Sequence, residues 1–117
     1  MLINLTPHPI VLRAADGTDT TITSSGVCRI AALPKGEPVV VEGCPVPVDS
    51  PDVFDAPTGL PEPQAGTWYI VSAVVGSAMA GKGRADLLTL GTGPQDGAIR
   101  DEQGRVIAVT RLKAVAA

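Results

Sequence analysis

The chain has 117 residues, a formal net charge of −3 and a hydrophobic content of 44%. This length is typical of a single domain, residues 1–117, and the apolar content excludes a disordered chain. The nine basic residues are scattered, which argues against nucleic acid as a partner because duplex binding requires a clustered positive surface. No apolar run approaches the roughly 20 residues that span a membrane, and no signal peptide is evident. We therefore expect a cytoplasmic protein without membrane contact.

The first half of the chain predicts short strands separated by turns. Apolar and β-branched residues begin almost at the N-terminus, and Asp16–Gly17 is a turn signal that indicates a hairpin. Apolar alternation and a run of valines extend the strand pattern further along the chain. We expect strands at Leu2–Leu5, Ile10–Ala14, Thr20–Thr23, Val27–Leu33 and Pro38–Glu42.

His8 is the only histidine and lies between Pro7 and Pro9. The two prolines restrict the backbone on either side, so the imidazole is held on a stiff local frame. Such a group is a candidate base or ligand-binding residue. The alternative is a structural histidine that bonds to the backbone near the first strand, because no Gly-x-Ser-x-Gly motif indicates a nucleophile for it to activate.

The two cysteines, Cys28 and Cys44, do not form a disulfide framework. Without an export signal we expect reduced thiols, each serving as a small core residue. Together with His8 they are too few and too poorly spaced for a zinc site. We expect no metal and no cofactor.

Residues 44–66 differ from the rest of the chain because they contain six prolines and show little periodicity. Proline at this density excludes a helix or a central strand. A loop of this length is either a solvated connector or a functional segment. The second interpretation is a lid or an oligomer arm anchored by Phe54.

The second half predicts a strand–helix–strand unit with a parallel crossover. Trp68–Ser72 is an apolar strand, Ala73–Ala80 is a short buried helix of small residues, and Asp86–Leu90 is the second strand. A turn at Asp101–Gly104 then precedes a last strand at Arg105–Leu112. The predicted fold is α+β, a mixed and mainly antiparallel sheet with one short helix.

A candidate anion site follows from this topology, because both loops that leave the carboxyl ends of parallel neighbours face one crevice. Backbone amides at a helix start attract phosphate or carboxylate, and an arginine binds phosphate through two hydrogen bonds. Helix capping, an ordinary glycine-rich connection and a surface ion pair are the alternative explanations. The predicted ligand-binding residues are His8, Ser72, Ala73, Thr92, Gly93, Arg100 and Arg105.

Three blocks of the sequence resemble a group of short proteins encoded by bacteriophages and prophages. They are Asn4–His8, Tyr69–Ser72 and Arg100–Ile107, and they span most of the chain except its proline-rich middle. Small phage accessory proteins include members that counter host immunity, some by sequestering nucleotide second messengers. The resemblance therefore implies an anti-defence role in the cytoplasm of an infected bacterial host.

We expect a non-enzymatic protein that binds a small anionic, nucleotide-like ligand. The alternatives are a structural or host-protein-binding phage protein and a small hydrolase or lyase that uses His8. We also expect a homo-oligomer, because valine-rich edge strands need cover and the proline-rich segment offers an arm that can reach a neighbour.

Overall fold

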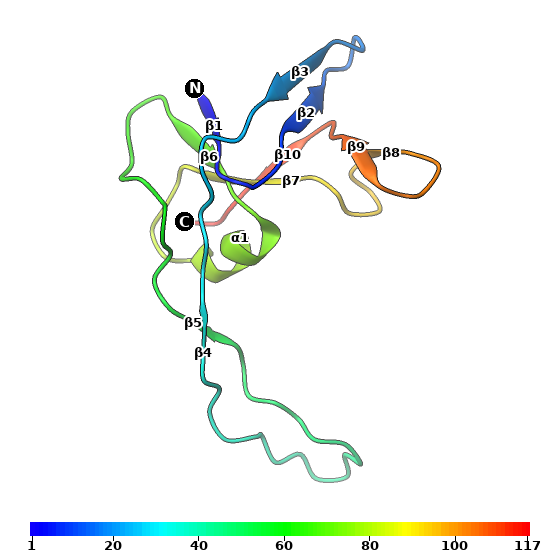
Figure 1. The fold of residues 1–117 in the computed structure, drawn as a ribbon. Helices are drawn as coiled ribbons and strands as arrows, with labels where there is room; N and C mark the ends of the chain where they lie inside the picture. The colour runs from blue at the N-terminus through cyan, green and yellow to red at the C-terminus, as the bar shows by residue number, and fades with distance from the viewer.

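A four-stranded mixed sheet lies at the centre of the computed structural model, which describes residues 1–117 (Figure 1). Its order is β1 (Leu2–Asn4), β6 (Trp68–Ile70), β7 (Leu87–Leu90) and β10 (Leu112–Ala114). The pairs β1–β6 and β6–β7 are parallel, whereas β10 is antiparallel to β7. With one helix and several antiparallel hairpins around this sheet, the predicted α+β fold is confirmed.

The crossover between β6 and β7 is made by α1 (Ala73–Met79), as the sequence predicts. Ser72 is the N-cap, and its Oγ accepts a hydrogen bond from the backbone N–H of Val75. Gly81 follows the helix with a φ of +76°, a conformation that glycine adopts without strain. Both signals for the ends of the helix are local, which explains why its position is readable from the sequence.

The central sheet is covered on both faces because its apolar side chains alternate along each strand. Tyr69 and Val71 pack on the α1 side, whereas Ile70 packs on the opposite side beneath Ile10 and Val109. The protein is therefore built in three thin layers: α1, the sheet and the β2–β3 hairpin with the end of β9. The core on the α1 side consists of Leu5, Cys28, Tyr69, Val71, Val75, Met79 and Leu87.

Two antiparallel hairpins flank the sheet. The pair β2 (Ile10–Arg13) and β3 (Asp19–Ile22) surrounds the predicted Asp16–Gly17 turn. The pair β8 (Ile99–Arg100) and β9 (Val106–Ala108) surrounds the turn at 101–104. Both positions agree with the turn residues in the sequence.

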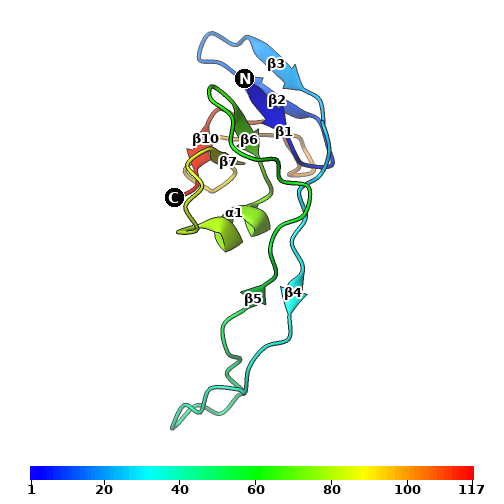
Figure 2. The ribbon, with the colours of Figure 1, turned by 90° about the vertical axis from the view of Figure 1, so that its left-hand side faces the viewer.

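A long two-stranded ribbon, the arm (residues 31–57), projects from the body of the protein (Figure 2). Its regular strands are only β4 (Ala32–Leu33) and β5 (Val53–Phe54). The predictions of strands over Val27–Leu33 and Pro38–Glu42 are wrong in extent, since the second of these makes only an isolated bridge between Val39 and Val48. The arm thus consists of an outgoing segment and a returning segment, and the returning segment contains most of the proline-rich region, residues 44–66.

The predicted last strand, Arg105–Leu112, is divided in the structure. After β9, the backbone of Val109 bonds to that of Val11 and Arg13 in β2, and the chain then enters the central sheet as β10. The prediction of two core cysteines holds for Cys28 alone, because Cys44 is half-buried on the arm. No helix has both the length and the apolar character needed to cross a bilayer.

Gly76 allows α1 to lie directly on β7, and its replacement is predicted to destabilise the fold. A Cβ atom at this position would lie 2.5 Å from Cγ2 of Thr89 and 3.4 Å from a methyl group of Val115. We expect Gly76→Ala to lower the free energy of unfolding by about 1–2 kcal/mol, even though alanine favours helix. Urea denaturation measures this loss.

The exposed neighbour Ser77→Ala serves as the control, with a change of at most about 0.5 kcal/mol expected. Thr89→Ser removes the contacting methyl group and should recover much of the loss in the double variant. An unchanged or increased stability of Gly76→Ala would contradict the close approach.

Candidate functional site

A cavity of about 360 Å³ opens beyond the carboxyl ends of β6 and β7, and we call it the β6–β7 cavity. Its walls come from five places in the chain: the loop between β1 and β2, strand β2, the β6–α1 junction, the end of β7 and strand β9. Four of the seven predicted ligand-binding residues line it: His8, Ser72, Ala73 and Thr92. The topology thus brings residues from both halves of the chain to one cavity.

Asn4 holds the loop that carries His8. The Asn4 Nδ2 group donates to the carbonyl oxygens of His8 (2.8 Å) and Ile22 (3.1 Å). Its Oδ1 accepts from the backbone N–H (2.9 Å) and the hydroxyl (2.6 Å) of Thr6. The side chain is completely buried, so these bonds replace all contact with water. The imidazole of His8 is exposed at the cavity and makes no hydrogen bond within the protein.

Ser72 and Ala73 occupy the cavity wall where β6 turns into α1. Ser72 Oγ accepts the Val75 amide proton at 3.3 Å, while its own hydroxyl proton has no acceptor in the protein. With only seven residues, α1 has a small dipole, so the predicted attraction of an anion to the helix start adds little. The chemistry of this wall is one free hydroxyl donor beside small apolar groups.

A second hollow of about 340 Å³ adjoins the cavity and shares Thr92 with it. We call it the Arg100 hollow, since Arg100 is its only charged lining residue. Arg100 Nη1 donates to the carbonyl oxygen of Gly104 (2.8 Å) and Nη2 donates to that of Thr92 (3.1 Å). These two bonds fix the orientation of the guanidinium, and its remaining N–H donors have no partner in the protein.

Gly93 lies in the Arg100 hollow, but its amide is not free for a ligand as the sequence argument requires. The Gly93 N–H donates to Asp96 Oδ2 at 2.8 Å, and Lys113 Nζ lies 2.9 Å from the same oxygen. The hydrogen bonds from Lys113 and from Gly93 hold the pKa of the Asp96 carboxyl below its usual value. Asp96 therefore acts as an anchor of the glycine-rich loop.

Arg105 lies outside both the cavity and the Arg100 hollow. Its side chain is 74% exposed and is paired with Asp101 at 3.3 Å, on the turn between β8 and β9. This is the surface ion pair that the sequence left open as an alternative. Of the two candidate arginines, only Arg100 is placed beside the cavity.

The β6–β7 cavity itself is mainly apolar. Nine of its 14 lining residues are hydrophobic, and none of the 14 is Lys, Arg, Asp or Glu. Polar contacts come from Thr6, His8, Ser72 and Thr92 at its edge. This lining suits an apolar ring or chain that carries a few hydrogen-bonding groups, and a negative charge finds a partner only at the neighbouring Arg100.

Sequence reasoning missed two parts of this site. The first is Asn4, whose position two residues before Thr6 is a local signal for a side chain that accepts a backbone N–H. The second is the wall formed by β2 and β9, which includes Val11, Val106 and Ile107. Nothing in the local sequence indicates that these two strands lie together over the end of the central sheet.

Comparison with family models, curated proteins and solved structures finds no match to the chain.

Replacement of Asn4 is predicted to destabilise the protein strongly. Asn4→Ala removes the acceptor of the Thr6 amide and the Nδ2 donor to the carbonyl oxygens of His8 and Ile22; the His8 oxygen keeps only the longer bond from the Thr6 hydroxyl, at 3.2 Å. We expect a loss of about 2–3 kcal/mol in the free energy of unfolding, measured by urea denaturation. Thr6→Val, which removes only the hydroxyl, is the matched control and should lose about 1 kcal/mol. An Asn4→Ala variant as stable as the parent protein would contradict the role of Asn4.

The Asp96 anchor predicts a defined pH dependence of stability. Folding lowers the pKa of Asp96. The stabilisation that its carboxylate contributes is therefore complete above the pKa of the unfolded state, about 3.9, and is lost as the pH falls through the lower pKa of the folded state. The difference in unfolding free energy between the parent protein and Asp96→Asn should therefore be largest near neutral pH and shrink below about pH 4. Denaturant titrations across this range test it.

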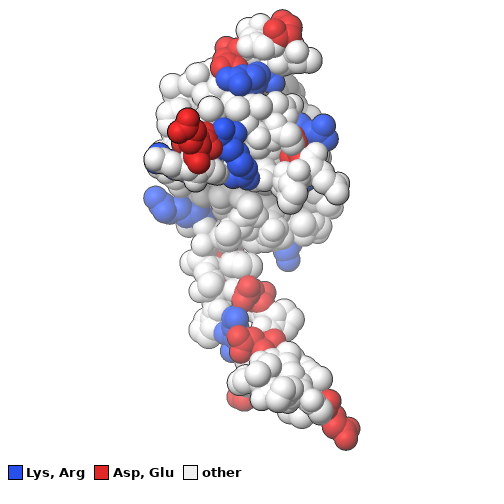
Figure 3. Space-filling view, turned by 90° about the vertical axis from the view of Figure 1, so that its right-hand side faces the viewer, with Lys and Arg blue, Asp and Glu red and all other residues white.

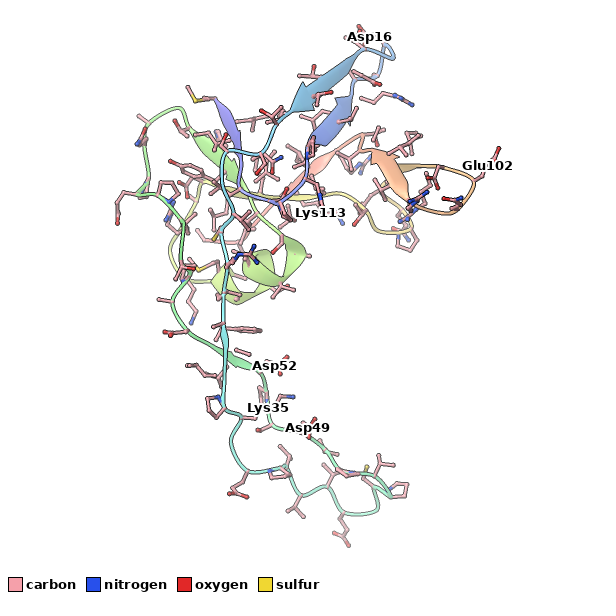
Figure 4. The ribbon with its side chains drawn as sticks, viewed as in Figure 1. Asp16, Lys35, Asp49, Asp52, Glu102 and Lys113 are labelled. Atoms are coloured by element: carbon pink, nitrogen blue, oxygen red, sulfur yellow. The ribbon has the colours of Figure 1, made fainter.

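Glu102→Gln provides the control, since Glu102 is exposed at the tip of the β8–β9 turn and forms no ion pair (Figure 4). Its stability should follow that of the parent protein at each pH. A difference for Asp96→Asn that stays constant from neutral to acidic pH would show that the carboxylate does not anchor the loop.

Proposed function

We propose that the protein binds and sequesters a small anionic ligand of the nucleotide class without changing it chemically. The observation that carries this proposal is the adjacency of the apolar β6–β7 cavity and the Arg100 hollow, joined at Thr92. A nucleotide has the same division, with a flat base at one end and phosphate at the other. The base would enter the cavity and the phosphate would meet Arg100.

The size and lining of the cavity support the base end of this arrangement. A volume of about 360 Å³ lies in the range of small-molecule sites. The valine and isoleucine side chains of the lining offer dispersion contacts to a flat ring, while His8, Ser72 and Thr92 supply hydrogen-bonding groups at the rim. A ligand that loses water from an apolar face on entry gains free energy from that burial.

The phosphate end is supported by the fixed orientation of Arg100. Its bonds to Gly104 and Thr92 hold the guanidinium in place before a ligand arrives, which reduces the ordering cost of binding. A planar guanidinium matches a phosphate through paired hydrogen bonds. The overall charge of −3 gives no long-range attraction for an anion, so affinity depends on these direct contacts.

Binding without catalysis is favoured by how the cavity's reactive groups are arranged. The Ser72 Oγ caps α1, and no carboxylate lines the cavity to orient His8. A serine nucleophile requires an adjacent base, and that base is usually oriented by a third group. Sequestration requires only that the ligand be held.

The phage resemblance of the three sequence blocks extends this proposal to a biological role. In an infected bacterium, a protein that holds a nucleotide immune signal lowers its free concentration and so counters the host defence. The alternative is a structural or host-protein-binding phage protein, which the exposed valines of the arm favour. In that case the cavity would bind no nucleotide.

The proposal is tested with the purified protein and a panel of cyclic dinucleotides, cyclic ADP-ribose isomers and linear mononucleotides. After gel filtration the bound fraction is released by heat and identified by mass spectrometry. Release of an intact nucleotide supports sequestration, a chemically altered product indicates an enzyme that uses His8, and the absence of binding across the panel indicates the structural alternative. Inorganic phosphate alone serves as the control for non-specific binding of an anion.

Arginine-to-lysine variants separate the two candidate cations. Arg100→Lys keeps the charge but loses the paired geometry, so we expect the dissociation constant of the retained nucleotide to rise about tenfold in calorimetry. Arg105→Lys is the matched control and should bind as the parent protein does, because Arg105 lies outside both hollows. His8→Ala should weaken binding while leaving the melting temperature unchanged. Equal affinities for all four proteins would contradict this placement of the ligand.

A further inference from the structure

The arm exposes large aliphatic side chains over most of its length. Val40 is 95% exposed and Val46 63% exposed, and Leu33, Val39, Val41 and Val53 are all more than a third exposed. These six make up half of the large hydrophobic residues exposed on the whole chain. A ribbon of two strands has no core to bury them, and such ribbons are only marginally stable alone. Clustered exposed apolar groups of this kind mark an interaction surface.

The arm is nevertheless a defined element, because polar contacts join its two segments. Val39 N–H donates to the carbonyl oxygen of Val48 at 2.8 Å, and Ser50 Oγ donates to that of Gly36 at 3.0 Å. Lys35 lies between two carboxylates of the returning segment, 3.5 Å from Asp49 and 3.1 Å from Asp52 (Figure 4). The apolar side chains are therefore presented on a preformed ribbon.

Charge is divided unevenly between the arm and the body. The arm carries one lysine and five carboxylates, a net charge of −4, which leaves eight cations and seven carboxylates, a net charge of +1, on the rest of the chain. Acidic side chains follow the arm down to its tip (Figure 3). Glu37 and Glu42 have no cationic partner. The arm thus presents apolar and negative groups together.

A hollow with the complementary character lies at the base of the arm. It has a volume of about 310 Å³, and we call it the root hollow. Its lining comes from residues 5–7, residues 27–30 and the start of α1 with its cap Ser72, and it shares Thr6 and Ser72 with the β6–β7 cavity. Val74, which is 57% exposed, contributes to its apolar lining. Arg29 is the only charged residue of this hollow and has no carboxylate partner. The root hollow therefore matches the tip of an arm in both polarity and charge.

We propose that two copies of the chain form a two-fold dimer by exchanging arms, with the tip of each arm in the root hollow of the other. The arm leads away from the body of the protein (Figure 1), so its tip does not reach the root hollow of its own chain, whereas the arm of a second copy can. In a two-fold arrangement with antiparallel arms, each tip lies opposite the partner's root, and both contacts are identical. Val40 then packs on Val74 of the other copy, and Glu42 pairs with its Arg29.

The length of the arm is consistent with this arrangement. About 12 residues separate Arg29 from the turn near Glu42, which corresponds to about 40 Å of extended chain. One face of a ribbon about 40 Å long and about 10 Å wide offers about half of the roughly 800 Å² that each partner buries in a stable interface. Contact of the tip with the partner's body supplies the remainder.

Sedimentation velocity on the full chain, from about 1 to about 100 µM, tests the dimer. We expect a dimer that dissociates on dilution, and a dissociation constant at least about tenfold higher for Val40→Glu. That variant still folds, because the Val40 side chain touches little else in the monomer; circular dichroism checks this. Thr21→Glu, on the exposed β3 strand, is the matched control and should dimerise like the parent protein.

A charge exchange identifies the proposed tip-to-root contact. Arg29→Glu and Glu42→Arg should each weaken the dimer, and the double variant should restore it, because each reversed charge then meets its complement on the other copy. A monomer at every concentration overturns the proposal, and so does a dimer that is insensitive to Val40→Glu. A dimer that both charge variants weaken but the double variant does not restore also overturns it. None of these outcomes depends on nucleotide binding, so dimerisation and the proposed function are tested separately.

Discussion

The buried amide of Asn4 is the interaction on which the arrangement of this protein depends. One side chain joins β1, the loop that carries His8 and the end of β3 through four hydrogen bonds. The backbone adds to this junction, since the Asn4 carbonyl oxygen accepts from Ser25 N–H at 2.8 Å. A buried amide costs free energy unless its donors and acceptor are satisfied, so the three segments are held in one relative position. That position sets β2 over the sheet and closes one wall of the β6–β7 cavity.

The core contains few residues, and the layers of the protein are thin. Only 16 of 117 residues are buried, and the approach of α1 to β7 depends on the missing side chain of Gly76. Of the three aromatic residues only Tyr69 is buried, while Trp68 is 41% exposed and Phe54 lies on the arm. Thin layers leave the hairpins supported mainly from one side. This explains why the cavity forms between elements, where β9 and β2 meet the end of the sheet, and not inside a single packed core.

Local sequence predicts the β6–α1–β7 unit because its strand pattern, its Ser72 cap and its Gly81 stop all lie within one segment. The same reasoning fails on the arm, because the valines near Val40 do not face a core. The alternation in residues 27–33 meets the core only through Cys28 and Ile30, before the arm begins. It also fails near the C-terminus, where the chain changes its pairing partner from β8 to β2 and then to β7 within a few residues. Apolar alternation reports that a segment is extended; it carries no information about which neighbour the segment joins or whether a neighbour is present in the same copy.

At the candidate site, too, the sequence predicts which loops meet but not which of their hydrogen-bond donors are free. Parallel strands predict that Ser72 and Thr92 meet, and both line the cavity. Tertiary contacts decide which N–H donors remain free for a ligand. The Gly93 N–H already donates to Asp96, whereas Arg100 has N–H groups in addition to those bonded to the carbonyl oxygens of Gly104 and Thr92. The remaining chemistry is an apolar cavity beside one oriented guanidinium, and the proposed ligand combines an apolar ring with a single anionic end because it would have to satisfy both. Under the proposed function, an inorganic anion alone would leave the cavity unfilled and a neutral ring alone would leave Arg100 without a partner, so tight binding would require a ligand long enough to reach past Thr92.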